Sequence, residues 1–354
     1  MLMSEKSKQH VDSCRFCWMC HHICPVGNAT GQERNTARAR ALGISLVNRE
    51  AIDLSEIMDN IYECATCGGC VSVCATGWDP VMFTKETRLL AAMEGKTPDY
   101  INALIDNCLE KGNAYGAEAA QFAGHTDKTD TLFFLGTDAR YMAKDCAEKA
   151  IKVMELTGEA FTVLNDEPAS GAQLDFLIGA AEETKQQMKD CAKVLNTFKT
   201  VVVYDPTDAK AMKHEYKEYG VEITAQVVTF TEYLSKANLG LKNTGKTVCY
   251  QDPFRLARDL KETEPAREII TKCAELKEML LNREETIWAG DVLMAQYTPT
   301  TIYKVSERRL ENVKSMGYNA VVTACVGEYV ALKNVKQDNV EIISLEELIL
   351  AAAK

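Results

Sequence analysis

Two short runs of cysteine near the N-terminus could do redox chemistry. Both follow the pattern C-x2-C-x2-C-x3-C, and the eight cysteines are Cys14, Cys17, Cys20 and Cys24, then Cys64, Cys67, Cys70 and Cys74. In two-cluster ferredoxins such a run gives three thiolates to one [4Fe-4S] cube, and its fourth cysteine ligates the other cube. We therefore predict two clusters, one held by Cys14, Cys17, Cys20 and Cys74 and the other by Cys64, Cys67, Cys70 and Cys24.

Zinc or free thiols explain these runs less well. Zinc sites pair C-x2-C units that a long loop separates, and an unbroken run of four thiols is not that spacing. Two complete copies also argue against an accidental group of free thiols. His21 and His22 lie inside the first run, but four thiolates already complete each cube, so we assign neither histidine as a ligand.

Composition places the chain among acidic, multidomain proteins. Its 354 residues are 46% apolar, enough for two or three cores, and its net charge is -11. An acidic surface argues against nucleic acid as a partner, because that role needs clustered Lys and Arg. No apolar run approaches the ~18 residues of a membrane-spanning helix, and the first ten residues lack a signal-peptide core. We therefore expect a cytoplasmic protein without a transmembrane segment.

Helices are expected to position the eight thiols. The thirty-nine residues between the two runs have helical periodicity, so we predict an all-helical ferredoxin-like domain over residues 1–111. Three arginines in this stretch are predicted to form a solvated, basic helix face that offsets cluster charge, or else a docking surface for an acidic partner. They are Arg34, Arg38 and Arg40.

The rest of the chain reads as alternating strands and helices. Gly, Ala and polar residues predict a linker over residues 112–130. Beyond it, LFFLG, FTVLND and TVVVYD are typical of buried strands, and helices are expected between them at Tyr141–Thr157 and Ala172–Phe198. This alternation predicts parallel α/β layers.

An internal repeat divides the α/β part. TVVVYDPTDAKAMKH, from Thr200, aligns with NAVVTACVGEYVALK, from Asn319, and both are followed by a strand and by similar endings, TFTEYL and ISLEEL. We therefore predict two related α/β units, residues 131–240 and 245–354, with a shared cleft between them as the place for a site.

Together these motifs resemble the cysteine-rich CCG redox subunits. That family includes the D subunit of heterodisulfide reductase, the iron-sulfur subunit of glycolate oxidase and the C subunit of anaerobic glycerol-3-phosphate dehydrogenase. The double cysteine run, the GNAYG turn that follows residue 111 and the duplicated α/β units carry the resemblance. It implies a helical dicluster domain followed by two CCG-like repeats.

The CCG repeats are degenerate in this chain. The resemblance implies five cysteine positions in each repeat, and only Cys325 remains of the ten. The other nine are occupied by Thr137, Ala169, Ser170, Pro206 and Ala209 in the first repeat and by Phe254, Trp288, Ala289 and Glu328 in the second. One thiol cannot hold a multinuclear iron-sulfur cluster, so we expect the repeats to keep the fold without that cofactor.

Three functions follow from this pattern. The favoured one is an iron-sulfur electron-transfer subunit of an oxidoreductase complex, relaying electrons between a flavin- or nicotinamide-dependent dehydrogenase partner and an acceptor such as ferredoxin or another carrier. The alternative is a catalytic subunit with a rebuilt site in the second repeat, where Cys325 and Glu328 would bind a metal beside Asp252, Arg255 and Trp288. A redox sensor is the third, and the acidic composition disfavours the nucleic-acid binding that sensors often need.

Overall fold

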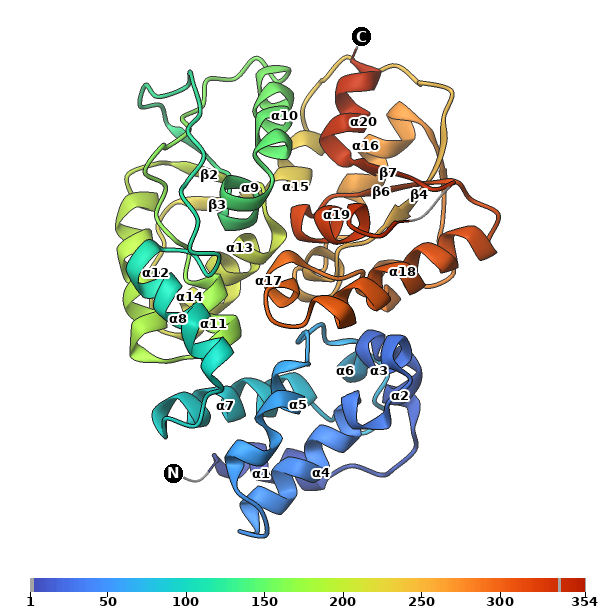
Figure 1. Ribbon diagram of the computed structural model, residues 1–354. Helices are drawn as coiled ribbons and strands as arrows, with labels where there is room; N and C mark the ends of the chain where they lie inside the picture. The colour runs from blue at the N-terminus through green and yellow to red at the C-terminus, as the bar shows by residue number, and fades with distance from the viewer. Residues whose placement is uncertain (1–2, 337–338, 354) are drawn as a thin grey trace.

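The computed structural model describes residues 3–336 and 339–353, so the outermost residues of the first and last predicted domains lie outside it. Helices make up the N-terminal part, and two α/β units lie side by side above it (Figure 1). The predicted fold class, a helical dicluster domain followed by α/β units with parallel strands, is confirmed.

Among the described residues before 131, all regular secondary structure is helical. Its helices are α1 (Glu5–Asp12), α2 (Met19–Ile23), α3 (Pro25–Thr30), α4 (Ala37–Asn48), α5 (Met58–Tyr62), α6 (Gly69–Ser72), α7 (Pro80–Met93) and α8 (Asp99–Lys111). Arg88 of α7 is fully buried among them, and its guanidinium donates to the carbonyls of Ile61, Cys64 and Phe176. This one side chain therefore fixes the second cysteine loop against the first α/β unit.

The first α/β unit contains a three-stranded parallel sheet in the order β1-β2-β3. Its strands are β1 (Thr131–Phe134), β2 (Thr200–Val203) and β3 (Gln226–Thr229), and its helices are α9 (Thr137–Met142), α10 (Lys144–Glu155), α11 (Ala172–Ile178), α12 (Glu182–Leu195), α13 (Pro206–Lys210), α14 (Tyr216–Glu218) and α15 (Phe230–Ser235).

Two expectations for this unit were wrong in detail. The strand expected at FTVLND is reduced to a single parallel bridge between Leu132 and Thr162. The helix expected at Ala172–Phe198 is broken at Gly179, whose φ is +60°. A Cβ there would lie 3.2 Å from the carbonyl oxygen of Lys85, so the break allows α11 to approach α7 closely.

The second unit repeats this plan with one more strand, in the order β5-β4-β6-β7. The strands are β4 (Thr247–Gln251), β5 (Glu275–Lys277), β6 (Ala320–Thr323) and β7 (Glu341–Ser344), and the helices are α16 (Pro265–Cys273), α17 (Val292–Ala295), α18 (Pro299–Ser315), α19 (Val326–Lys333) and α20 (Leu345–Ala352).

The two repeat sequences adopt the same local structure. Each forms a strand, a helical segment, a parallel neighbouring strand and a final helix. The order is β2, α13 to α14, β3 and α15 in the first repeat and β6, α19, β7 and α20 in the second. Thr229 and Ser344 occupy the same place in this order, since each caps the final helix by accepting from a backbone N–H three residues later. This agreement supports the predicted internal repeat.

Apolar side chains join the three parts of the molecule. One core runs through both α/β units, and it includes Phe133 of β1, Tyr204 after β2 and Val322 of β6. A second core joins the N-terminal helices to residues of both units, including Phe176 and Phe254. The cysteine loops are therefore held against the junction of the two α/β units.

Candidate functional site

The two cysteine loops have the same backbone conformation. In each loop the second and fourth residues after the first cysteine have positive φ: 55° for Phe16 and 69° for Trp18, then 49° for Thr66 and 71° for Gly68. The turn brings a backbone N–H to the first thiol of each run, at 3.4 Å from Phe16 to Cys14 Sγ and at 3.4 Å from Thr66 to Cys64 Sγ. Such N–H donors stabilise a thiolate.

Three thiols of the second run share one cavity with the last thiol of the first run. Cys24, Cys64, Cys67 and Cys70 line this cavity, and none of them is in a disulfide. Burial raises the pKa of Cys70 well above that of a free thiol, and the three neighbouring thiols raise it further. Burial also raises the pKa of Cys24 and Cys67. Four thiols that face one space fit the donor set of a [4Fe-4S] cluster, whose iron would supply the positive charge that thiolates need there.

The other thiols of the first run lie nearer to the protein surface. Cys17 is exposed, and Phe16 and Trp18 beside it are 60% and 45% exposed. Burial raises the pKa of Cys20, and the Coulomb repulsion of Cys14 and Cys17 adds to the rise. The first group of thiols therefore reaches the protein surface at Cys17, whereas the second group lines an internal cavity.

The predicted basic face is wrong for one of its three arginines. Arg34 is exposed and Arg38 is partly exposed, and they pair with Glu63 at 3.2 Å and Glu33 at 2.7 Å. Arg40 instead is buried, lines the cavity of the second thiol group and donates from Nε to the carbonyl of Asn60 at 2.9 Å. The helical pattern could not reveal this, because only the packing of α4 decides which arginine faces the cysteines.

The second cysteine loop contacts the second α/β unit through arginines. Nε of Arg258 donates to the carbonyl of Cys67 at 2.7 Å, and a guanidinium nitrogen of Arg255 lies 3.4 Å from Thr66 Oγ1. Both arginines belong to one π-helical turn, Arg255–Asp259. Arg255 also lines the cleft between the two units, so it lies between the cysteine loop and that cleft.

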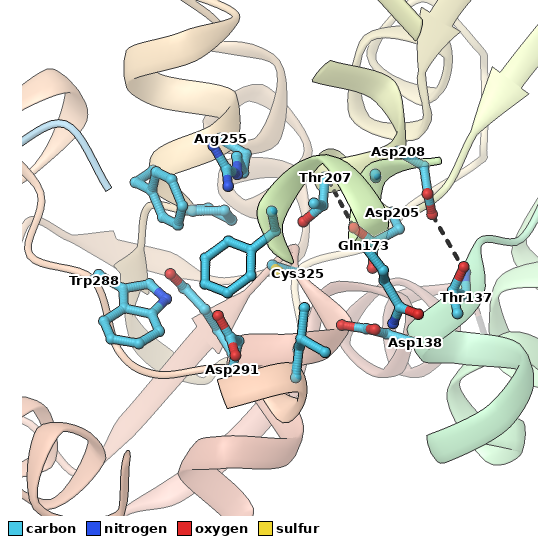
Figure 2. A pocket seen from close by; sticks show the side chains of 17 residues that line it. Thr137, Asp138, Gln173, Asp205, Thr207, Asp208, Arg255, Trp288, Asp291 and Cys325 are labelled. Carbon is cyan, nitrogen blue, oxygen red and sulfur yellow. Dashed lines mark hydrogen bonds between the residues drawn. The ribbon is translucent and has the colours of Figure 1, made fainter. Parts of the chain in front are cut away.

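The cleft contains a small cavity of about 50 Å³ that side chains of both units line. Asp138 and Asp205 come from the segments that follow β1 and β2, and Cys325 from the segment that follows β6 (Figure 2). The carboxyl ends of parallel strands from both sheets therefore meet here, which is where α/β proteins commonly bind ligands.

Carboxylates give the cavity a strongly acidic lining. They are Asp138, Asp205, Asp208, Asp291 and Glu328. Burial raises the pKa of Asp291 to about 6 and that of Glu328 to about 8. For Asp138, burial and then repulsion by Asp205 raise the pKa well above its usual value. The carboxyl groups of this cavity therefore resist full ionisation as long as no positively charged ligand enters it.

Four of the five residues predicted for a rebuilt site meet at this cavity. Arg255, Trp288, Cys325 and Glu328 line it. Asp252 is not among the lining residues. It is buried in an ion pair with Arg267, with oxygen-to-nitrogen distances of 2.6 and 2.8 Å.

The sequence prediction missed the aspartates. Asp138, Asp205 and Asp291 directly adjoin positions that the repeats mark, in the segments GTDARY, DPTDAK and WAGD. These three segments contain four aspartates, and this concentration of acidic residues could have indicated an acidic site. The family pattern marks cysteine positions only, so the carboxylates beside them did not stand out.

Comparisons with known proteins agree with this arrangement. Residues 10–78 match the family model described as a 4Fe-4S dicluster domain. The D subunit of dihydromethanophenazine:CoB–CoM heterodisulfide reductase from Methanosarcina acetivorans is 24% identical, over 89% of this chain and 86% of its own length. The B subunit of fumarate reductase (CoM/CoB) from Methanothermobacter marburgensis is 20% identical, over 88% of this chain and 65% of its own length.

The crystal structure of a hypothetical protein from Helicobacter pylori has the same fold. It covers 99% of this chain and 73% of the other, with a TM-score of 0.52 and 12% sequence identity. Within the part of the chain that the structure describes, no helix is long and apolar enough to cross a membrane. The chain thus carries a 4Fe-4S dicluster domain and is distantly homologous, over nearly its whole length, to CCG-type iron-sulfur subunits.

Proposed function

We propose that this distant homologue of the heterodisulfide reductase D subunit is an electron-transfer subunit of a larger oxidoreductase. Its partner would be a flavin- or nicotinamide-dependent dehydrogenase subunit, and its acceptor a ferredoxin or another carrier. Two [4Fe-4S] clusters, when bound, would each accept and release one electron. The names of the relatives, which are subunits of reductases, support a place in a multisubunit complex. The cytoplasmic location stays a prediction.

The position of the two thiol groups carries this proposal. Cys14, Cys17, Cys20 and Cys74 would hold the outer cluster, where exposed Cys17 and Trp18 offer a partner access. The inner cluster would be held by Cys64, Cys67, Cys70 and Cys24, and all four of these cysteines line one cavity.

The inner loop also touches the cleft through Arg255. The chain therefore offers a route from its surface to the junction of its two α/β units. Its own residues supply thiolates, N–H donors to sulfur and apolar cover.

Metal and sulfide analysis tests the proposal. Anaerobically purified chain should contain about eight iron and eight sulfide, since each cube holds four of each. Cys20→Ala should remove or alter one cluster, while Cys191→Ala, a buried cysteine far from both runs in sequence, should leave the iron content unchanged. About four iron in the wild-type chain, or equal iron loss in both variants, would contradict the assignment.

A second candidate function is catalysis in the cleft. The acidic cavity beside Arg255 favours it, because a carboxylate-lined space next to an electron route could bind a substrate. Turnover of a small substrate by the isolated chain would support this candidate. An isolated chain that is reduced and reoxidised but turns over nothing would leave the relay as its function.

A further inference from the structure

The cavity in the cleft has an unbalanced charge. Five carboxylates line it, and Arg255 is the single Lys, Arg or His among the described residues that do so. One terminal nitrogen of the Arg255 guanidinium is paired with Asp259 at 2.8 Å, outside this lining, while its Nε is buried without a hydrogen-bond partner. When its carboxyl groups are ionised, the lining can therefore stabilise additional positive charge.

Two carboxylate oxygens at this cavity have no hydrogen-bond partner. They are Oδ2 of Asp205 and Oε1 of Glu328, and each residue is only 1% exposed. The second oxygen of each group is satisfied, by the N–H of Thr207 at 2.7 Å and by Nε2 of Gln251 at 3.1 Å. Because a buried, unpaired carboxylate oxygen is costly, such an atom points to something that binds there.

Cys325 lies close to three of the carboxylates. Burial raises the pKa of its thiol well above the usual value, and negative charge on Asp205, Glu328 and Asp138 raises it further. One thiol and three carboxylates, from both α/β units, thus line a common space. Figure 2 labels Cys325, Asp138 and Asp205 among them. One thiol does not suffice for an iron-sulfur cluster, so the cysteine-ligated cluster that the CCG resemblance implies does not fit here.

We propose that this cavity binds one divalent metal cation through Asp138, Asp205, Cys325 and Glu328. A volume of about 50 Å³ suits an ion with one or two waters. Mixed oxygen and sulfur donors favour a borderline cation such as Zn²⁺ over Mg²⁺ or Ca²⁺.

The four proposed ligands stand apart in the structure. Across residues 3–336 and 339–353, no three His, Cys, Asp or Glu side chains stand at the spacing of a bound ion. Binding therefore requires these four side chains to move closer together.

Zinc analysis of the anaerobic holoprotein tests the site. The chain is equilibrated with Zn²⁺, passed through a desalting column and analysed for zinc, iron and sulfide. The wild type should retain about one zinc with its iron and sulfide unchanged. Asp205→Asn and Cys325→Ser should each weaken zinc binding by at least about tenfold, the usual cost of losing a ligand contact or its support.

Asparagine keeps the local structure of the variant intact. Asp205 caps α13 with its side chain, and Asn caps a helix equally well. Asp53→Asn is the matched control, since Asp53 caps the short helix Leu54–Ile57 and does not line the cavity. Should Asp205→Asn lose its iron, Glu328→Gln takes its place in the comparison.

Three results would overturn the metal site: no zinc retained by the wild type, equal zinc in wild type and Asp205→Asn, or zinc bound only as iron is lost. The iron and sulfide contents separate this outcome from the electron-transfer proposal. About eight of each without zinc would refute the cation site alone, whereas iron that is already low before zinc is added, followed by retention of one zinc, would refute the relay alone.

Discussion

Replacement of Arg40 by methionine should lower the reduction potential of the inner cluster. Arg40 is buried and lines the cavity of Cys24, Cys64, Cys67 and Cys70. Burial lowers its pKa, but the charges of Cys64, Cys24 and Cys70 outweigh this effect and raise it, so the guanidinium stays positive. A fixed positive charge stabilises the reduced, more negative cluster, and methionine removes that charge while filling similar space.

The size of the effect follows from Coulomb's law. A unit charge roughly 7 Å from the cluster centre, at an effective dielectric constant of about 20, contributes about 2 kcal/mol. For a one-electron couple this corresponds to a potential change of roughly 100 mV. We therefore expect the inner cluster to shift downward by about 50–100 mV, since partial solvent screening reduces the full value.

Redox titration followed by electron paramagnetic resonance can measure the two clusters separately. Arg38→Met is the matched control, because Arg38 lies on the same helix and pairs with Glu33 but does not line the cavity of the inner thiols. Arg40→Lys should restore most of the potential. An unchanged inner potential in Arg40→Met, or equal shifts in the Arg40 and Arg38 variants, would refute the reasoning, provided that the iron content is that of the wild type.

Three further predictions test the cysteine assignment, the buried ion pair and the pH dependence. Cys24→Ser should alter or remove the inner cluster and leave the outer one, as spectroscopy of the reduced protein would show; loss confined to the outer cluster would contradict this. Arg267→Met should cost about 3–5 kcal/mol in the free energy of unfolding in urea, because Asp252 loses its buried partner. A cost below about 1 kcal/mol would mean that Asp252 relaxes into solvent. Burial raises the pKa of Glu328 to about 8, so the folded protein holds a proton that the unfolded chain releases. Without divalent metal, stability should fall as the pH rises from about 5 to 8, and Glu328→Gln should flatten this fall; parallel curves would contradict it.

The sequence by itself determined the chemistry of the N-terminal part and the class of the fold. Cysteine spacing is a local property, because a short loop must place its three thiols on one cube. The periodicity of apolar residues likewise predicts helices and buried strands without knowledge of their neighbours. The internal repeat was visible for the same reason, since similar local sequences form the same strand and helix order.

Only the tertiary structure decided which side chains meet. Arg40 and Arg38 lie two residues apart on one helix, yet Arg40 is buried beside the inner thiols, whereas Arg38 is partly exposed and pairs with Glu33. Asp252 was expected in the cleft, but packing pairs it with Arg267, while Asp138 and Asp205 reach the cavity from another sheet. A cavity between two duplicated units depends on contacts between residues far apart in sequence, and the strand and helix pattern of either unit does not contain that information.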